Sequence, residues 1–259
     1  WDSLTRRIKY IICLFLLFTE LKKNEEKIVF CFQANIYCIL ICKLFKTKIL
    51  IRSNSSPSGW SKNFIKIFFY KKVLKMADKI MVNSLEFKKQ LKINFNLKSE
   101  CIYNPLNIKE ITKLSKNKIK ENFLKEAELK IISVGRFADQ KDHLTLLRAI
   151  NCLKEKINLR LIIIGGGPNK AKLENYIISN NLLKIVKIKN FIQNPYPYIL
   201  KANLFILSSL YEGLPNVLLE TLALNRFVIS SNCPTGPSEI LDNNKGGLLF
   251  KVGDYNNLI

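Results

Sequence analysis

Short apolar runs alternate with helical patterns through the second half of the chain, and this alternation limits the possible folds more than any other feature. The expected strands are Lys130–Val134, Leu159–Ile164, Ile185–Ile188, Leu204–Leu207, Phe227–Ser230 and Leu248–Phe250. The expected helices between them are approximately Asp142–Lys154, Asn169–Asn180, Tyr196–Lys201, Pro215–Ala223 and Pro237–Leu241. Strands rich in β-branched residues that alternate with amphipathic helices are typical of a parallel, doubly wound sheet. The pattern therefore predicts an α/β domain.

The first half of the chain follows the same pattern less regularly. Its expected strands are Ile28–Phe32, Lys48–Arg52, Lys79–Asn83 and Cys101–Tyr103, and its expected helices are Ile36–Phe45, Ser61–Met76 and Leu85–Phe95. Asn104-Pro105 ends this pattern, and a charged segment from Lys109 to Glu128 follows. A chain of 259 residues is long enough for two domains. We therefore predict a first domain with its linker over residues 1–127 and a second domain over residues 128–259.

The charge of the chain points to a phosphate-bearing partner. The net charge is +22, and the part up to Ala127 holds 26 of the 42 basic residues but only 10 of the 20 acidic ones. Such a bias is expected for partners such as nucleic acid, anionic lipid or a phosphorylated small ligand, although a biased genome composition would produce it equally well. No nucleic-acid-binding motif accompanies the charge, so nucleic acid is not an expected partner. A hydrophobic content of 48% makes disorder improbable.

The cysteines and the single histidine argue against a metal site. The seven cysteines form no C-x-x-C pair and lie mostly in apolar runs, which is typical of small core residues in a reducing compartment. His143 is interpreted as a helix-surface residue rather than a catalytic base, and no zinc or other metal site is predicted. The apolar stretch Ile8–Phe18 is too short to span a bilayer and is predicted to be a buried helix.

Two glutamates eight positions apart, Glu212 and Glu220, form the first candidate site. A Gly-Leu-Pro turn follows the first of them, so the next helix should begin near Pro215 or Asn216. Glu212 then precedes the helix and Glu220 lies in its second turn. The free amides of residues 216–218 could hold an anion or sugar hydroxyls. An isolated pair of this kind is more often a loop acid and a solvated helix acid, but here an apolar strand precedes it, which is typical of a ligand site at the carboxyl end of a parallel sheet.

A second candidate site follows the strand Lys130–Val134, in the segment Gly135-Arg136-Phe-Ala-Asp-Gln-Lys141. A glycine at the end of a strand allows a ligand to approach the backbone closely. Two cations five residues apart could clamp a diphosphate from both sides. The same spacing alone would more often be an ordinary surface loop with basic residues.

Together these segments resemble the E-x7-E and G-R-x-x-x-x-K motifs of retaining glycosyltransferases of family four. The resemblance implies a GT-B fold, in which two Rossmann-like domains with parallel sheets face a cleft. It also implies that Arg136 and Lys141 neutralise the donor diphosphate, that Glu212 contacts the donor sugar near the reacting carbon and that Glu220 holds the ribose. The implied catalytic residues are Glu212, Arg136 and Lys141, and the implied donor-binding residues are Gly135, Glu220, Gly213, Leu214, Pro215, Asn216, Val217 and Phe191.

Four further features bear on this resemblance. Gly165-Gly-Gly-Pro168 fails as a dinucleotide fingerprint because Lys170 occupies the third glycine position, but it is similar to a family turn near the nucleotide. The segment from Asn232 to Leu241 resembles members that act on amino-sugar donors. Phe191 lies in the loop that reads the base in relatives, where it could stack on the base or belong to the core. Gln33 replaces a histidine that many relatives have near the reacting sugar.

The resemblance implies metal-independent, retaining transfer of a hexose, with an N-acetylhexosamine as one candidate, from a nucleotide-diphosphate sugar, most simply a UDP-sugar. The expected acceptor is a lipid-linked or cell-surface glycan such as lipopolysaccharide, and no cofactor is expected. The helix Ser61–Met76 carries Phe64, Phe68, Lys71 and Lys75 on one stripe, which is compatible with an anionic membrane or with solvent. The expected location is the cytoplasmic face of a membrane.

Two alternatives are kept beside this reading: a nucleotide-sugar 2-epimerase of the same fold and an inactive, membrane-associated binding protein. Release of free sugar and nucleotide without an acceptor would identify the epimerase. An intact set of charged motif residues argues against the inactive protein. The chain is also expected to be a fragment that lacks both ends, with an incomplete first domain and reduced transfer activity.

Overall fold

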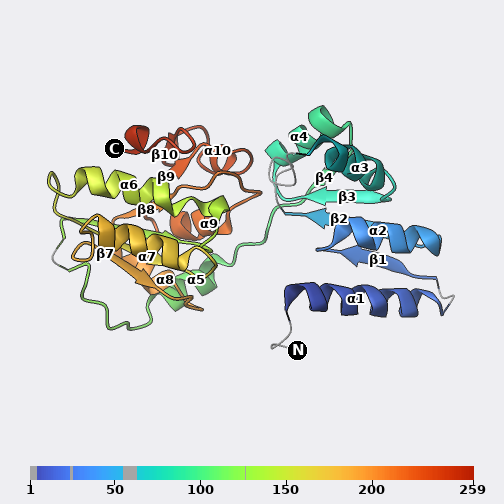
Figure 1. Cartoon of the computed structure of the whole chain (residues 1–259), viewed down its shortest axis with the longest axis horizontal. Coiled ribbons are helices and arrows are strands. Elements are labelled where there is room, and N and C mark those ends of the chain that lie inside the picture. Colours follow the sequence, from blue (N-terminus) through green and yellow to red (C-terminus); the bar gives the residue numbers. More distant parts are fainter. Residues whose placement is uncertain (1–4, 24–25, 55–62, 126) are drawn as a thin grey trace. The chain divides into compact units, whose positions relative to one another are not determined.

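The computed structural model describes residues 5–23, 26–54, 63–125 and 127–259. These residues form two compact units that divide between Tyr103 and Asn104. Each unit contains one parallel sheet with helices packed against it (Figure 1). The predicted α/β class with two parallel sheets is confirmed.

The first unit contains a four-stranded parallel sheet in the order β1-β2-β3-β4. Its strands are β1 (Ile28–Cys31), β2 (Lys48–Ser53), β3 (Lys79–Val82) and β4 (Glu100–Cys101), and its helices are α1 (Arg6–Leu21), α2 (Asn35–Leu44), α3 (Phe64–Leu74) and α4 (Leu85–Phe95). Alternate strand residues such as Ile49 and Ile51 pack with Ile39 of α2 and Phe87 of α4 in one core. The expected period of two residues in the strands thus decides which side chains face the helices.

The second unit contains a six-stranded parallel sheet in the order β7-β6-β5-β8-β9-β10. The strands are β5 (Leu129–Val134), β6 (Leu159–Ile164), β7 (Val186–Lys189), β8 (Leu204–Leu207), β9 (Phe227–Ser231) and β10 (Leu248–Phe250). Along the chain, β6 pairs with β5 and β7 pairs with β6, and β8 then pairs with the other side of β5. The loops that follow the neighbouring strands β5 and β8 therefore run in opposite directions. Doubly wound sheets bind ligands at the point where the strand order reverses in this way.

Helices cover both faces of this sheet. They are α5 (Ile108–Ser115), the 3₁₀ turn η2 (Asp139–Lys141), α6 (His143–Leu153), α7 (Lys170–Ser179), α8 (Tyr196–Lys201), α9 (Asn216–Ala223), α10 (Pro237–Ile240) and α11 (Tyr255–Leu258). One face packs Ile131 and Ile163 against Leu146 of α6, and the other packs Ile132 against Leu218 of α9. The strands are buried from both sides, which explains why their sequences are almost continuously apolar.

All ten predicted strands are present, but helix α5 was missed. Asn107 accepts a hydrogen bond from the Glu110 amide at 3.1 Å and donates one to the Glu110 carboxylate at 3.0 Å. This reciprocal cap begins α5 inside the segment that was read as a charged linker. Ile111 of α5 is buried in the core of the second unit, so the segment from Asn104 packs with that unit although it was counted with the first domain.

The prediction that Ile8–Phe18 forms a buried helix is half wrong. The segment is helical, within α1, but the side chains of Ile11 and Phe15 are 67% and 64% exposed. Leu17 and Leu21 are the α1 residues that pack on the core of the first unit, because they lie on the stripe that faces α2. Within the described ranges, helices that combine the length and the apolar character needed to cross a membrane are not found.

The cysteines follow the core prediction only in part. All seven are free thiols, and Cys31, Cys42 and Cys233 are buried. Cys13 and Cys152 are exposed, because each occupies a helix position that faces solvent.

Candidate functional site

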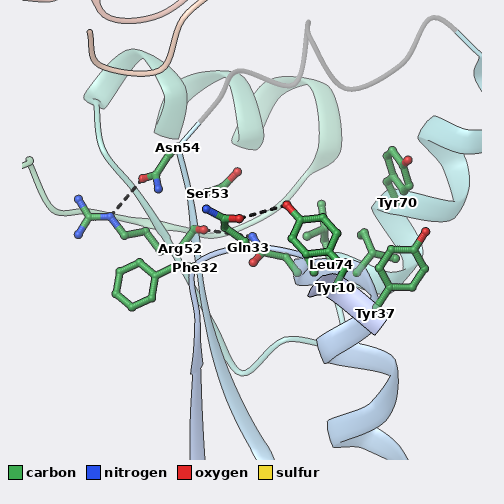
Figure 2. Close-up of a pocket in the computed structure, with 12 residues that line it drawn as sticks. Tyr10, Phe32, Gln33, Tyr37, Arg52, Ser53, Asn54, Tyr70 and Leu74 are labelled. Carbon is green, nitrogen blue, oxygen red and sulfur yellow. Dashed lines mark hydrogen bonds between the residues drawn. The ribbon is translucent and has the colours of Figure 1, made fainter. Parts of the chain in front are cut away.

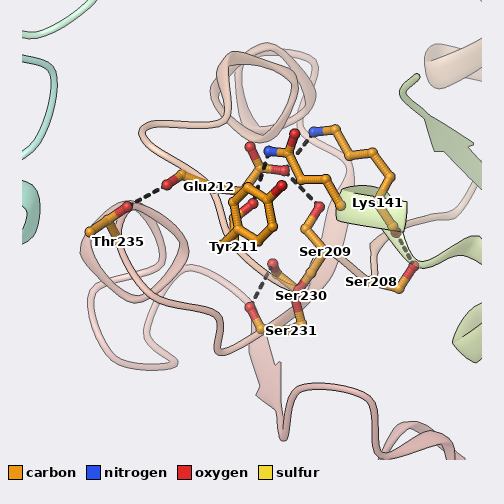
Figure 3. Close-up of polar contacts among 9 residues, drawn as sticks. Lys141, Ser208, Ser209, Tyr211, Glu212, Ser230, Ser231 and Thr235 are labelled. Atoms are coloured by element: carbon orange, nitrogen blue, oxygen red, sulfur yellow. Dashed lines mark hydrogen bonds and ion pairs between the residues drawn. The ribbon is translucent and has the colours of Figure 1, made fainter. Parts of the chain in front are cut away.

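Lys141 and Glu212 meet at the reversal point of the second sheet (Figure 3). Lys141 ends the 3₁₀ turn after β5, and Glu212 lies in the loop after β8. The Lys141 ammonium lies 2.5 Å from Glu212 Oε1, and the Ser209 hydroxyl donates to the same oxygen at 2.6 Å. Glu212 is only 6% exposed. Two residues 71 positions apart in the sequence are thus held as one charged pair with little access to water.

Hydrogen bonds to main-chain carbonyls join the two loops. The Gln140 amide group donates to the Tyr211 carbonyl at 2.9 Å, and the Leu210 amide donates to the Gln140 carbonyl at 2.8 Å. The Ser208 hydroxyl donates to the Lys141 carbonyl at 3.0 Å. Hydrogen bonds of this kind fix backbone positions, so the contact between the charged pair does not depend on the pair alone.

The end of β9 and the loop between β9 and α10 also hold the loop that carries Glu212. Thr235 donates to the Glu212 carbonyl at 2.6 Å, and Ser231 donates to the Ser209 carbonyl at 2.6 Å (Figure 3). Gly236 has φ +92°, and a Cβ atom there would lie 2.5 Å from the Gly213 carbonyl oxygen. The segment from Asn232, which the sequence connected with donor identity, therefore has a direct role in holding the glutamate loop. Sequence reasoning missed that role.

Gly135 and Arg136 begin the loop that ends at Lys141, and Gly135 lies directly beside the Lys141 side chain. The aliphatic carbons of the Lys141 side chain pass 3.4 Å from the position that a Cβ atom on Gly135 would occupy. Arg136 is exposed and forms no ion pair with any residue that the structure describes. The next residue, Phe137, is fully buried and anchors the loop. Lys141 is therefore held inside the site, and Arg136 lies on the same loop with its side chain in solvent.

The three glycines after β6 pack directly against this loop. A Cβ atom on Gly165 would lie 2.0 Å from the Gly135 carbonyl oxygen, and one on Gly167, at φ +148°, would lie 2.5 Å from the Phe137 carbonyl oxygen. The Phe137 amide donates to the Gly166 carbonyl at 2.9 Å. Backbone contacts this close require residues without a side chain. The glycines thus position the arginine loop, in addition to turning the chain.

Helix α9 begins at Asn216 after Pro215, as predicted. The prediction that the Leu218 amide is free is wrong, because it donates to the Pro215 carbonyl at 3.0 Å. The first two helical amides, those of Asn216 and Val217, remain at a helix start that no side chain caps. The side chain of Val217 packs on the core, so only its backbone can take part in the site.

The remaining candidates divide into buried and exposed residues. Gly213, Leu214 and Pro215 are buried and shape the turn. Glu220 is half-buried on α9, and burial raises the pKa of its carboxyl, while a hydrogen bond with the Tyr196 hydroxyl opposes that rise. Phe191 is 77% exposed, which excludes the core role and leaves its ring at the surface.

His143 is buried, so its interpretation as a helix-surface residue is wrong. It is the first residue of α6, and its ring meets the edge of Phe137 with centroids 5.6 Å apart. Burial, together with the charge of Lys141, lowers the pKa of His143 to about 4. The imidazole is therefore neutral at physiological pH and acts as a packing residue behind the Lys141 loop.

This depressed pKa predicts a loss of stability in mild acid. The unfolded chain takes up a proton near pH 6.5, whereas the folded chain does so only near pH 4, so stability is complete above pH 6.5 and falls below it. At pH 5 we expect a loss of about 2 kcal/mol in the free energy of unfolding relative to pH 7. Urea denaturation followed by circular dichroism measures it. His143→Asn should reduce this pH dependence, and an identical dependence in that variant would contradict the assignment.

No group of three or more histidine, cysteine, aspartate or glutamate side chains that could hold a metal ion occurs among the described residues. The charged groups that the site does offer are the Lys141 ammonium, paired with the buried Glu212 carboxylate, and the exposed Arg136 on the same loop as Lys141. The uncapped start of α9 follows the Glu212 loop in the sequence. This combination lies at the reversal point of a doubly wound parallel sheet, where α/β domains bind ligands.

Comparison with known proteins identifies the family. The model for glycosyl transferases group 1 matches residues 115–259, and the chain belongs to this family. An uncharacterised glycosyltransferase of Methanocaldococcus jannaschii is 36% identical over 218 residues, which cover 78% of this chain and 53% of that protein. A Campylobacter jejuni enzyme, N-acetylgalactosamine-N,N'-diacetylbacillosaminyl-diphospho-undecaprenol 4-alpha-N-acetylgalactosaminyltransferase, is 31% identical over 246 residues, or 90% of this chain and 65% of the enzyme.

The fold agrees with this family. The crystal structure of Anabaena HepE in complex with UDP superposes with a TM-score of 0.71 at 16% identity, covering 94% of this chain and 70% of HepE. The fold is that of the GT-B glycosyltransferases. The chain spans 53% and 65% of the length of the two curated relatives.

Proposed function

We propose that the protein is a retaining glycosyltransferase that takes a sugar from a nucleotide-diphosphate donor, most simply a UDP-sugar. The observation that carries the proposal is the buried Lys141–Glu212 pair at the reversal point of the second sheet, with Arg136 exposed on the same loop. Cations placed where a diphosphate departs, and a carboxylate beside them, suit the transfer of a glycosyl group. HepE, which shares the fold, was crystallised with UDP.

The role of the cations follows from the charge that develops during the reaction. When the bond between the anomeric carbon and the diphosphate breaks, negative charge grows on the phosphate oxygens. Lys141 uses one of its three N–H donors on Glu212 and keeps others for the diphosphate, and Arg136 offers a planar fork of donors. The amides of Asn216 and Val217 add the positive end of a helix dipole. Preorganised donors of this kind stabilise the departing group.

The two glutamates have separate roles in the proposal. Glu212 orients the donor sugar and faces the positive charge that develops at the anomeric carbon. Glu220, which lies about one turn after the start of α9, accepts hydrogen bonds from the ribose hydroxyls. The exposed ring of Phe191 lies beside the loop of Gly166, where it can contact the base. Retention of configuration at the anomeric carbon is read directly by NMR of the product.

Nucleotide binding tests the proposal. Charge-assisted hydrogen bonds contribute about 1.5–3 kcal/mol, so Arg136→Ala and Lys141→Ala should each weaken UDP binding by roughly 10- to 100-fold. Isothermal titration calorimetry measures the affinity in EDTA, because the protein cations are proposed to do the work of a divalent ion. Lys130→Ala, on the far end of β5, serves as a matched control. Unchanged affinity in both site variants, or binding that needs added Mg²⁺ or Mn²⁺, would contradict the proposal.

The proposed acceptor is a lipid-linked or cell-surface glycan. The Campylobacter relative named above acts on a diphospho-undecaprenol substrate, and this supports a lipid-linked acceptor here. Helix α3 offers a surface for the membrane that would carry such a substrate. Its Phe64 and Phe68 side chains are exposed, and the Lys72 ammonium lies 4.8 Å from the centre of the Phe68 ring. Aromatic residues mixed with lysines are typical of surfaces that rest on anionic lipid. Ser61 and Lys62, with which this helix was predicted to begin, lie outside the described residues.

Vesicle binding checks the membrane contact. Replacing both Phe64 and Phe68 by serine should reduce binding to vesicles with anionic lipid by at least about tenfold, because two exposed aromatic rings no longer enter the interface. Sedimentation with phosphatidylglycerol vesicles measures the bound fraction. Phe227→Ser, which removes an exposed phenylalanine of the second unit, is the control and should bind like the unchanged protein. Equal binding by all three proteins would exclude α3 as the contact.

A further inference from the structure

Two cysteines in the first unit share one hydrogen-bond acceptor. Cys31 is the last residue of β1, and Cys38 lies in the first turn of α2. The Cys31 Sγ atom lies 2.7 Å from the Gln33 carbonyl oxygen, and the Cys38 Sγ atom lies 3.9 Å from the same oxygen. The two thiols also hydrogen bond with each other. The fold therefore holds two nucleophilic side chains in contact, although six residues separate them in the sequence.

The neighbouring cysteines do not offer an equivalent pair. Cys42 lies four positions after Cys38 on α2 and is fully buried in the core of the first unit. Side chains four apart on a helix have Cβ atoms about 5–6 Å apart, whereas a disulfide needs about 3.5–4.5 Å. Cys13 is exposed on α1, and the part of the chain that the structure describes shows no hydrogen bond between Cys13 and another thiol. Cys31 and Cys38 are thus the pair that the geometry favours.

The contact makes the two thiols chemically different. The hydrogen bond with Cys38 lowers the pKa of Cys31, although burial acts in the opposite direction. The same hydrogen bond, together with burial, raises the pKa of Cys38. Because the thiolate is the reactive form of cysteine, Cys31 is the nucleophile of the pair and Cys38 is the member that keeps its proton.

A pocket of about 450 Å³ brings solvent close to this pair (Figure 2). Gln33 and Asn35 line the pocket, and both contact the Cys31 sulfur, since Asn35 Oδ1 lies 3.2 Å from it. Cys31 itself is only 6% exposed, whereas Cys38 is partly exposed. A small oxidant such as hydrogen peroxide can reach the pair through this shell of one residue, while bulky thiol reagents are kept from Cys31.

We propose that Cys31 and Cys38 form a peroxide-sensitive dithiol that closes to a reversible disulfide. The Cys31 thiolate attacks one oxygen of hydrogen peroxide, the O–O bond breaks, and the leaving hydroxide takes up a proton and becomes water. The sulfur of Cys38 then attacks the Cys31 sulfenic acid as it loses its proton, the S–O bond breaks, and a second water leaves. In sum, two thiols lose two electrons and two protons, and the peroxide is reduced to two waters.

The disulfide fixes the loop that the two cysteines enclose. Ala34 in this loop has φ +55°, a left-handed conformation that is uncommon for a residue with a side chain. In the reduced protein the Asn35 side chain ties the loop to β2, through a hydrogen bond of 3.1 Å to the Arg52 carbonyl. A covalent link between β1 and α2 adds a second constraint on residues 32–37. The redox state of the pair therefore controls how freely this loop moves.

Mass spectrometry after graded treatment with hydrogen peroxide tests the proposal. Remaining thiols are alkylated in denaturant, and the protein is digested without reduction. We expect the first product to be a linked Cys31–Cys38 peptide that lacks two hydrogen atoms and is restored by dithiothreitol. Because a resolving thiol is already in contact, it should form at least about tenfold faster than any oxidation of the exposed Cys13 and Cys152. Hydrogen exchange of the amides of residues 32–37 should be slower in the oxidised protein.

Two variants complete the experiment, with circular dichroism to check that each is folded. Cys38→Ser should form no disulfide at Cys31 and should leave a Cys31 sulfenic acid that dimedone traps. Cys13→Ser is the matched control, because it removes an exposed thiol of the same unit, and it should form the Cys31–Cys38 disulfide at the normal rate. A different pair as the first product, earlier oxidation of Cys13 or Cys152, or Cys31 that ends as sulfinic acid in the unchanged protein would each overturn the proposal.

Discussion

Replacing Glu212 by alanine is expected to lower the turnover number by about 10²–10³-fold, since a carboxylate placed to stabilise developing positive charge contributes on that scale. The carboxylate is buried and held by Lys141 and Ser209, so water cannot substitute for it without rearranging three loops. The measurement is donor turnover, followed as release of UDP, under saturating donor. The affinity for UDP itself should change less, because the charge on Lys141 remains.

Two variants serve as comparisons for Glu212→Ala. Glu212→Gln keeps the shape and the hydrogen bond from Ser209 but removes the charge, so it should lose most of the turnover as well. Glu220→Ala should instead weaken nucleotide binding, with a smaller effect on turnover, because its proposed contact is the ribose. If Glu212→Ala retained the turnover of the unchanged protein, Glu212 would be a structural acid of the loop and not part of the reaction.

Gly165→Ala is expected to be among the most damaging single-methyl additions in this chain. The new Cβ atom would lie 2.0 Å from the Gly135 carbonyl oxygen and 2.8 Å from a ring carbon of Phe137. The backbone of one loop must move, because neither contact atom is the end of a flexible side chain. We expect a loss of at least about 3 kcal/mol in the free energy of unfolding, measured by urea denaturation, together with loss of UDP binding.

The neighbouring glycine provides a matched control for this steric effect. A Cβ atom on Gly166 would meet only the Cβ atom of Phe191, at 3.9 Å, which is an ordinary van der Waals contact. Gly166→Ala should therefore stay within about 1 kcal/mol of the unchanged protein. Equal destabilisation by the two substitutions would show that the close approach of the two loops does not explain the need for glycine at position 165.

Much of the fold could be predicted because its strands are buried from both sides. Ile162 and its neighbours in β6 must be apolar on both faces, so the strand stands out in the sequence. The start of α9 at Asn216 followed from the proline before it. The linear sequence also contained the pair Lys141 and Glu212 as parts of two motifs, and the strand order explains why they meet.

The features that were missed depend on what packs against a segment. The sequence of α1 is apolar, but the sequence does not show how many other elements cover this helix. Phe15 of α1 is exposed. His143 was interpreted as a surface residue, yet its ring packs against that of Phe137 and is buried. The cap that begins α5 could have been found from Asn107 and Glu110. The charged residues around this cap led to the interpretation of the segment as a linker.

The bonds that hold the glutamate loop have a consequence for mutational tolerance. Gln140, Ser208, Ser231 and Thr235 all donate from their side chains, but each acceptor is a main-chain carbonyl, that of Tyr211, Lys141, Ser209 or Glu212. A carbonyl is present whatever the side chain. Tyr211, whose side chain has no proposed role in the reaction, can therefore vary in an evolving sequence without releasing the loop, as long as the four donor positions are kept.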